Sequence, residues 1–316
     1  MKHHVLSGID RIDTVHDLLA GKRVGLMTTP TGVDHDLRST IDILNERFNL
    51  SALFAVEHGI RGDAQAGAKI GTTVDVQTGV TVYSAYGDND HFNDEMLAAF
   101  DVLVFDIQDV GARFYTYLYS LSYAMMACAR SGKEMVVLDR VNPIGGKRLS
   151  GTILDTRFSS FVGDYALPTQ YGLTIGEYAR YVRDYLKLDV ALTVVPLAGW
   201  TRDMYLDDTD LPWIAPSPNC QNLDAALCYI GTCVFEGTNV SEGRGTTMPF
   251  QVMGAPWIDG AALEEKMNAM KLSGVHFRAT TFVPTFSKHQ GELCRGVQLH
   301  ILDRDNAAVF EAGLLL

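Results

Sequence analysis

The chain has 316 residues, of which 47% are hydrophobic and 20% are charged, a composition typical of a globular protein with a sizeable core. Its formal net charge of −12 argues against nucleic acid as a partner, because a phosphate-backbone binder needs a basic face. We find no run of roughly 18 to 20 apolar residues that could span a membrane and no signal-peptide core, so we expect a cytoplasmic protein without a membrane partner.

The first half of the chain alternates short apolar, β-branched runs with helical patterns, which predicts a Rossmann-like α/β domain with a mostly parallel sheet. The predicted strands are Val24 to Thr28, Ser51 to Val56, Val80 to Ser84, Val102 to Ile107 and Glu134 to Leu138. The predicted helices between them are Leu37 to Arg47, Asp94 to Phe100 and Tyr115 to Arg130. The nearly continuous apolar content of the strands indicates burial on both faces of the sheet.

The second half of the chain carries weaker signals. Thr174 and Glu177 form the pattern of a capping box, in which the glutamate has a structural role at the start of an amphipathic helix. Further expected elements are strands at Leu192 to Val195 and near Thr232 to Phe235, a helix at Ala261 to Met270, and strands near Val275 to Phe277 and Val297 to Leu302. We therefore expect a Rossmann-like domain over residues 1–255 and a smaller α+β domain over residues 256–316.

Common cofactor motifs are missing. The first predicted strand is not followed by the Gly-x-Gly-x-x-Gly fingerprint of dinucleotide enzymes, and the Gly-Gly-Lys at 145–147 lacks the remaining P-loop residues. The five cysteines are an odd number without a Cys-x-x-Cys pair, which favours a reducing compartment over a zinc site or disulfides. No His-x-x-x-His or His-Glu-x-x-His spacing occurs, so we expect no metal and no cofactor.

Polar residues follow the predicted strands, and the carboxyl ends of parallel strands share the edge where such sheets bind ligands. Glu57 comes directly after a buried run, where a carboxylate beside apolar neighbours has the raised pKa that a general acid needs. The alternative is a structural carboxylate held by loop amides or by Arg61. His58 alone is more typical of a hydrogen-bonded loop residue.

The loop after the fourth strand carries Asp106, Gln108, Asp109, Arg113 and Tyr115. One aspartate could be the second carboxylate of a glycosidase pair, or an Asp–Arg ion pair could brace the turn at Gly111. The loop after the fifth strand presents Asp139, Arg140 and Asn142 beside a proline turn. Farther along, Glu242 and Arg244 alternate with glycines, a pattern that fits either a ligand-binding turn or a salt-bridged surface turn.

Taken in order, these segments resemble the exo-β-N-acetylmuramidase family typified by NamZ (YbbC-type proteins), long described only as a domain of unknown function. The matching stretches are 24–32 (VGLMTTPTG), 54–59 (FAVEHG), 105–117 (FDIQDVGARFYTY), 138–146 (LDRVNPIGG), 171–177 (YGLTIGE), 216–219 (PSPN), 241–247 (SEGRGTT) and 254–257 (GAPW). No single stretch is decisive, but the ordered set spans nearly the whole chain and is highly specific.

The resemblance implies a glycoside hydrolase that releases N-acetylmuramic acid from the non-reducing end of peptidoglycan fragments, in murein turnover and recycling. It places the catalytic glutamate at Glu57, and Asp109, Glu242 or Asp106 would then activate water or stabilise an oxocarbenium-like transition state. The expected substrate-binding residues are His58, Asp106, Gln108, Arg113, Tyr115, Asp139, Arg140, Asn142 and Arg244. The arginines among them would bind the lactyl carboxylate.

Members of this family continue beyond the position of Leu316, so we expect the smaller domain to be incomplete. The alternative function is a non-catalytic protein that binds muropeptides or another acidic sugar. The sequence gives no indication of the oligomeric state.

Overall fold

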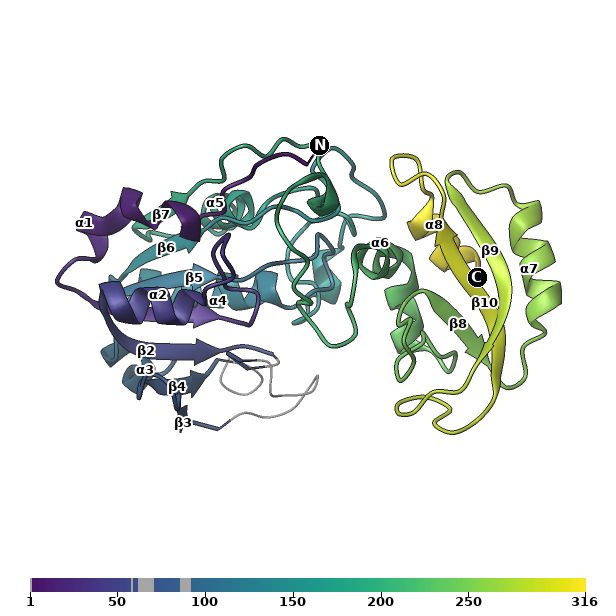
Figure 1. Ribbon diagram of the computed structural model, residues 1–316, viewed down its shortest axis with the longest axis horizontal. Helices are drawn as coiled ribbons and strands as arrows, with labels where there is room; N and C mark the ends of the chain where they lie inside the picture. The colour runs from purple at the N-terminus through teal and green to yellow at the C-terminus, as the bar shows by residue number, and fades with distance from the viewer. Residues whose placement is uncertain (1, 58, 62–70, 86–91) are drawn as a thin grey trace. The chain divides into compact units, whose positions relative to one another are not determined.

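A computed structural model describes residues 2–57, 59–61, 71–85 and 92–316 (Figure 1). The chain divides into two compact units. The first comprises Met1–Lys147, Thr156–Asp164 and Gly172–Pro218, and the second comprises Arg148–Asp155, Tyr165–Tyr171 and Asn219–Leu316. Within the described ranges, no helix is long and apolar enough to cross a membrane.

The first unit contains a seven-stranded sheet in the order β3-β4-β2-β1-β5-β6-β7. Its strands are β1 (Arg23–Thr28), β2 (Asn49–Ala55), β3 (Thr73–Val74), β4 (Thr81–Ser84), β5 (Val102–Asp106), β6 (Glu134–Leu138) and β7 (Leu192–Val195). All neighbouring pairs are parallel except β3 with β4. The expectation of a mostly parallel sheet is therefore confirmed, and β3 is an additional strand.

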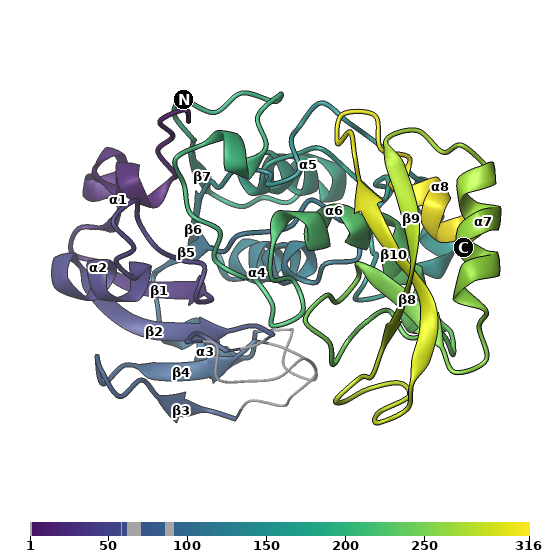
Figure 2. The same ribbon diagram turned by 45° about the vertical axis from the view of Figure 1, so that its right-hand side comes forward.

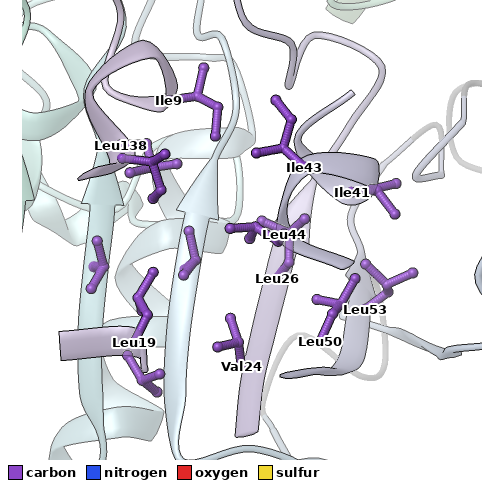
Figure 3. Packing of buried hydrophobic residues seen from close by; sticks show 14 of the residues in the cluster. Ile9, Leu19, Val24, Leu26, Ile41, Ile43, Leu44, Leu50, Leu53 and Leu138 are labelled. Carbon is purple, nitrogen blue, oxygen red and sulfur yellow. The ribbon is translucent and has the colours of Figure 1, made fainter. Parts of the chain in front are cut away.

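Helices cover both faces of this sheet (Figures 1 and 2). The helical elements of the first unit are η1 (Ile9–Val15), α1 (His16–Leu19), α2 (Thr40–Arg47), α3 (Asp94–Ala98), α4 (Tyr117–Ser131), η3 (Thr156–Phe158), α5 (Ile175–Leu186) and η4 (Leu206–Asp208). On one face, Ile43 and Leu44 of α2 pack with Val24 and Leu26 of β1 in a fully apolar cluster (Figure 3). This burial of aliphatic side chains is the main force holding α2 against the sheet.

The opposite face of the sheet packs against α4 and α5. A side chain added at Gly25 of β1 would meet the rings of Phe54 and Phe100, which lie 5.5 Å apart on that face. The hydroxyls of Ser122 in α4 and Tyr178 in α5 are 2.8 Å apart, which joins the two helices inside the layer. The strands are thus buried on both sides, as their continuous apolar content indicates.

Helix boundaries follow local capping chemistry. The side chain of Ser39 accepts a hydrogen bond from the Ile41 amide, so α2 begins at Thr40 and not at Leu37, which instead adopts a positive φ of 65° in the preceding turn. The predicted capping box of Thr174 and Glu177 is confirmed at the start of α5, where each side chain bonds the other residue's backbone amide.

The second unit is built on a three-stranded antiparallel sheet in the order β8-β10-β9. Its elements are α6 (Leu223–Thr232), η5 (Cys233–Gly237), β8 (Val252–Ala255), α7 (Gly260–Ala269), β9 (Val275–Phe282), β10 (Cys294–Ile301) and α8 (Val309–Leu315). Figure 2 shows β9 and β10 running beside each other, with α7 next to them. The expected smaller α+β fold is confirmed. Its boundary at residue 256 stays a prediction. Strand β8, which ends just before that residue, pairs with β10 of the same sheet.

One expected strand is wrong. The segment from Thr232 to Phe235 ends helix α6 and continues into the 3-10 helix η5. Only Thr232 of this segment belongs to α6 and the other three residues belong to η5, and such a short apolar run cannot be assigned to a helix or a buried strand by pattern alone. The side chain of Asn222, which accepts a hydrogen bond from the Ala225 amide, marks where the helix starts.

All five cysteines are buried: Cys128, Cys220, Cys228, Cys233 and Cys294. Burial raises the pKa of the Cys128 thiol to about 12 and also raises the pKa of Cys228. The thiols therefore behave as small apolar side chains in the two cores.

Candidate active site

The sheet order reverses at β1, which has β2 on one side and β5 on the other. At such a point the loops leaving adjacent strands diverge to opposite faces, and the carboxyl edge between them is where open α/β sheets place ligands. Because β1, β2, β5 and β6 are mutually parallel, the residues that follow all four strands lie along this one edge. The candidate residues of the first unit follow β2, β5 and β6.

Glu57 lies two residues beyond the end of β2 and is half-buried. The hydroxyl of Thr116 donates a hydrogen bond of 2.9 Å to Glu57 Oε2. Arg61, the structural partner considered from the sequence, instead forms a bidentate ion pair with Asp75 at 2.7 and 3.0 Å. A carboxyl group that bonds a hydroxyl keeps a partner in both protonation states, because the hydroxyl can also accept, and this suits a group that donates a proton.

Asp106, the last residue of β5, is fully buried and forms an ion pair with Arg140, which follows β6. Arg140 Nε and Nη2 donate hydrogen bonds of 2.6 and 2.8 Å to the two carboxylate oxygens, and the hydroxyl of Thr40 also donates to Asp106. Such a paired, hydrogen-bonded charge in the interior fixes the ends of two neighbouring strands. Asp106 thus has a bracing role, although its partner is Arg140 and not an arginine of its own loop.

Gln108 and Arg140 line a depression at the carboxyl edge together with Thr31, Val33, Asp34, Leu206, Leu211, Pro212, Trp213 and Ile214. The Gln108 side-chain amide donates to the carbonyls of Asp109 and Val141 at 2.7 and 2.8 Å, and its backbone amide bonds the Thr31 hydroxyl. The depression combines a guanidinium, an amide and an indole ring, which are groups that recognise polar, ring-shaped ligands.

Asp109 and Asn142 shape the neighbouring turn. Asp109 Oδ2 accepts a hydrogen bond of 2.7 Å from the Gly111 amide, and Asn142 donates to the carbonyl of Leu173 at 2.9 Å. Gly111 has a positive φ of 84°, and a side chain there would come within 2.5 Å of Asn142 Oδ1. Asp109 and Asn142 therefore both support this turn, and Asp109 provides its carboxylate.

Arg113 and Tyr115 continue the same loop. Arg113 is buried, with its guanidinium 5.3 Å from the centre of the Phe114 ring, and burial lowers its pKa from the ordinary value. The Tyr115 ring contacts that of Tyr117 edge to face at 4.9 Å, and the Tyr117 hydroxyl donates to the carbonyl of Pro216. Tyr117 is consequently a core residue.

Asp139, which follows β6, bonds the start of helix α5. Its carboxylate accepts hydrogen bonds from the Thr174 hydroxyl and the Gly176 amide at 2.9 and 2.7 Å. Burial raises its pKa to about 6, and these hydrogen bonds only partly oppose the shift. Asp139 thus ties the end of β6 to the start of helix α5.

Glu242 and Arg244 belong to the second unit. Glu242 is buried, and its carboxylate lies 2.8 Å from Lys288 Nζ and 3.4 Å from Arg244 Nε. Arg244 also pairs with Glu236. The salt-bridged turn considered from the sequence is therefore present, but it is interior and it includes Lys288, a cation 46 residues away along the chain.

His58 lies outside the described residues. Among the described residues, Thr116 and Trp213 were not singled out from the sequence, although each contacts the candidate edge. Thr116 could have been found as the residue at the start of a predicted helix, where Ser and Thr side chains gather. Trp213 sits in an irregular proline-containing segment that carries no periodic signal.

Comparison with known proteins covers nearly the whole chain. The family described as "Exo-beta-N-acetylmuramidase NamZ, N-terminal" matches residues 24–224, and "Exo-beta-N-acetylmuramidase NamZ, C-terminal" matches residues 227–316. The chain is 50% identical to the peptidoglycan beta-N-acetylmuramidase NamZ of Bacillus subtilis (strain 168), over 99% of this chain and 76% of that protein.

Two crystal structures of DUF1343 family proteins from Bacteroides fragilis NCTC 9343 are also similar. One is 40% identical with a TM-score of 0.92, covering 99% of this chain and 81% of that one. The other is 32% identical with a TM-score of 0.78, covering 98% and 80%. The chain belongs to the exo-beta-N-acetylmuramidase NamZ family.

Proposed function

We propose that this protein is an exo-β-N-acetylmuramidase that releases N-acetylmuramic acid from the non-reducing end of peptidoglycan fragments. The observation that carries the proposal is 50% identity to a peptidoglycan beta-N-acetylmuramidase across 99% of the chain. The placement of a carboxyl group at the carboxyl edge of the parallel sheet supports it, because this edge is where the fold binds ligands. The cytoplasmic location expected from the sequence remains a prediction.

Glu57 is the proposed general acid. It would protonate the glycosidic oxygen of the leaving sugar, with the Thr116 hydroxyl holding its carboxyl group in position. Asp109 is a proposed partner carboxylate in the same unit, where it would activate water or stabilise the oxocarbenium-like transition state. Glu242 remains a second candidate for that role. The substrate's own acetamido oxygen is an alternative nucleophile.

The lactyl carboxylate of the substrate requires a cation, and the proposed cations are Arg113, Arg140 and Arg244. Arg140 lines the depression beside Gln108, although two of its nitrogens are bonded to Asp106. Of the three arginines, Arg140 is the one that lines this depression.

Replacing Glu57 by Gln tests the mechanism. We expect release of N-acetylmuramic acid from a disaccharide that carries this sugar at the non-reducing end to fall by about 10²- to 10⁴-fold, the usual contribution of general acid–base catalysis, with the melting temperature unchanged. Glu46→Gln is a matched control, because Glu46 is an exposed residue of α2 that forms a surface ion pair with Arg38. Near-normal turnover by the Glu57 variant would remove this residue from the role.

The direction of attack is tested with two isomeric disaccharides. An exo-enzyme acting at the non-reducing end releases N-acetylmuramic acid when this sugar is the non-reducing residue, and leaves the disaccharide with N-acetylglucosamine at that end intact. Product identity is read by mass spectrometry. Binding of the first disaccharide without any turnover would instead support the alternative of a muropeptide-binding protein.

A further inference from the structure

A cluster of two histidines and one aspartate lies apart from the candidate carboxylates of the active site. His4 Nδ1 is 2.6 Å and His35 Nε2 is 3.1 Å from the same oxygen, Asp210 Oδ2. The three atoms that could bind a ligand all lie within 4.8 Å of one another. The residues come from three separate stretches of the first unit, so only the fold brings them together.

Hydrogen bonds that do not use the ligand atoms hold these three stretches in place. The amide of His3 bonds the carbonyl of Asp208 at 2.8 Å, and the amide of Asp210 bonds the carbonyl of His3 at 2.9 Å. Asp10 accepts hydrogen bonds from the amides of Ser7 and His35, both at 2.7 Å, which ties the N-terminal segment to the turn that carries His35. The arrangement is therefore built before any ligand arrives.

The carboxylate of Asp210 is also oriented. Its second oxygen, Oδ1, accepts a hydrogen bond of 3.0 Å from the Val5 amide, so Oδ2 is the oxygen directed at the two imidazoles. Proteins orient metal-binding carboxylates in the same way, through a partner on the atom that does not bind the metal. Asp10 and Asp36 add negative charge around His35, which favours a cation over an anion.

The chemistry of the three groups selects the ligand. Two imidazole nitrogens and one carboxylate oxygen are the donor set of three-ligand zinc sites, in which water completes a tetrahedron. The side chains are 68%, 34% and 28% exposed for His4, His35 and Asp210, so an ion can reach them from solvent. A simple ion pair needs only one imidazole, whereas here two converge on one oxygen.

We propose that His4, His35 and Asp210 form a binding site for a divalent transition-metal ion, with Zn²⁺ as the fitting ion. The bound ion would join the N-terminal segment to the turn at His35 and to the segment before Leu211. This site contains none of the residues assigned to the proposed hydrolase reaction, and its ligands His35 and Asp210 each adjoin in sequence a residue that lines the depression.

Isothermal titration calorimetry of the metal-free, untagged full chain with Zn²⁺ tests the proposal. We expect one site, with affinity lowered by at least about ten- to a hundredfold in His4→Ala, His35→Ala and Asp210→Asn, since even outer-shell changes typically cause losses of this size. Asp210→Asn retains an oxygen for the Val5 amide and so keeps the local fold. His3→Ala and His16→Ala are matched controls: His3 neighbours the cluster in sequence, and His16 contacts an aspartate, Asp17, at the surface.

A crystal of the unmodified chain soaked in Zn²⁺ gives a second readout that does not depend on any variant. An anomalous peak about 2.0–2.2 Å from His4 Nδ1, His35 Nε2 and Asp210 Oδ2 is the expected result. Absence of such a peak, or equal affinity in the control and ligand variants, would overturn the proposal.

Discussion

Thr116 donates a hydrogen bond to Glu57, the proposed general acid, and its side chain does not cap a helix. It precedes helix α4 but makes no side-chain capping bond, so its hydroxyl is available to Glu57. A hydrogen bond of this kind contributes about 0.5–1.5 kcal/mol, which corresponds to roughly two- to tenfold in a rate constant. Thr116 is therefore proposed as a positioning residue for the reaction.

Thr116→Val should lower kcat for the disaccharide with N-acetylmuramic acid at its non-reducing end by about two- to tenfold, while leaving KM and the melting temperature nearly unchanged. Valine matches threonine in shape but cannot bond the carboxyl group. Thr116→Ser, which keeps the hydroxyl, should restore most of the rate. Equal rates for the valine variant and the unmodified protein, measured as full pH profiles, would show that the contact has no positioning role.

Asp139 should make the stability of the first unit depend on pH. Its pKa is raised from 3.8 to about 6 in the folded protein, so the folded state holds a proton that the unfolded state releases. The resulting stabilisation is fully present below about pH 4 and is lost as the pH rises through 6. Its upper limit is about 3 kcal/mol, because each pKa unit corresponds to about 1.4 kcal/mol.

Urea unfolding of the protein and of Asp139→Asn at pH 4 and pH 7 measures this effect. The stability of the unmodified protein relative to the variant should be greater at pH 4 than at pH 7, since asparagine does not titrate. The difference between the two proteins cancels the contributions to the free energy of unfolding from groups that titrate in both. A difference that is the same at both pH values would mean that Asp139 titrates alike in the folded and unfolded chain.

At the level of elements, helices α6 and α8 approach each other through glycine. A side chain at Gly313 would come within 2.0 Å of the Gly231 carbonyl oxygen, and one at Gly231 within 1.9 Å of the Val309 carbonyl oxygen. No side chain can occupy such a position unless the backbones separate. The two helices therefore depend on these small residues for their contact.

Gly313→Ala should destabilise the protein by about 1–3 kcal/mol, the usual cost of inserting a group into a filled interior, despite the better helix propensity of alanine. Gly237→Ala is the matched control in the same unit, because, its two chain neighbours aside, no atom of the described residues lies within 4 Å of the position where its side chain would begin. Thermal unfolding should show a lower midpoint for the first variant and no loss for the second. A stable Gly313 variant would show that the helices can move apart at little cost.

Elements differ in how well their sequence reveals them. The parallel strands of the first unit were predictable within a few residues, because each is an apolar run bounded by polar turns. The predicted strand at Thr232 to Phe235 is wrong because this short, largely buried run belongs to the end of α6 and to the 3-10 helix η5, and four residues are too few to show a helical period. Helix α2 was placed three residues early, because only the turn geometry at Leu37 reveals that the cap is Ser39.

At the level of the whole molecule, the sequence could predict which loops share the carboxyl edge but not how their side chains pair. Arg140 forms an ion pair with Asp106, 34 residues earlier, which no local spacing in the sequence indicates. Likewise, Glu242 bonds Lys288, which no local spacing connects to it. Long-range pairs of this kind depend on strand order and loop path, which the chain's periodicity does not contain.

The five buried cysteines distribute unevenly between the two units: Cys128 belongs to the first, and the other four belong to the second. Thiols that are inaccessible, and whose pKa is raised, react slowly with alkylating agents. The native protein should therefore resist iodoacetamide, and modification should appear only as urea opens the core around each cysteine. Rapid labelling without denaturant, seen by peptide mass spectrometry, would contradict this burial.

Because of this placement, alkylation of the native cysteines reports the unfolding of each unit separately. Labelling of the peptide that contains Cys128 shows when the first unit unfolds. Labelling of the peptides that contain the other four cysteines shows when the second unit unfolds. Without an introduced probe, a single quench series would thus tell whether one half of the enzyme melts ahead of the other or both melt at once.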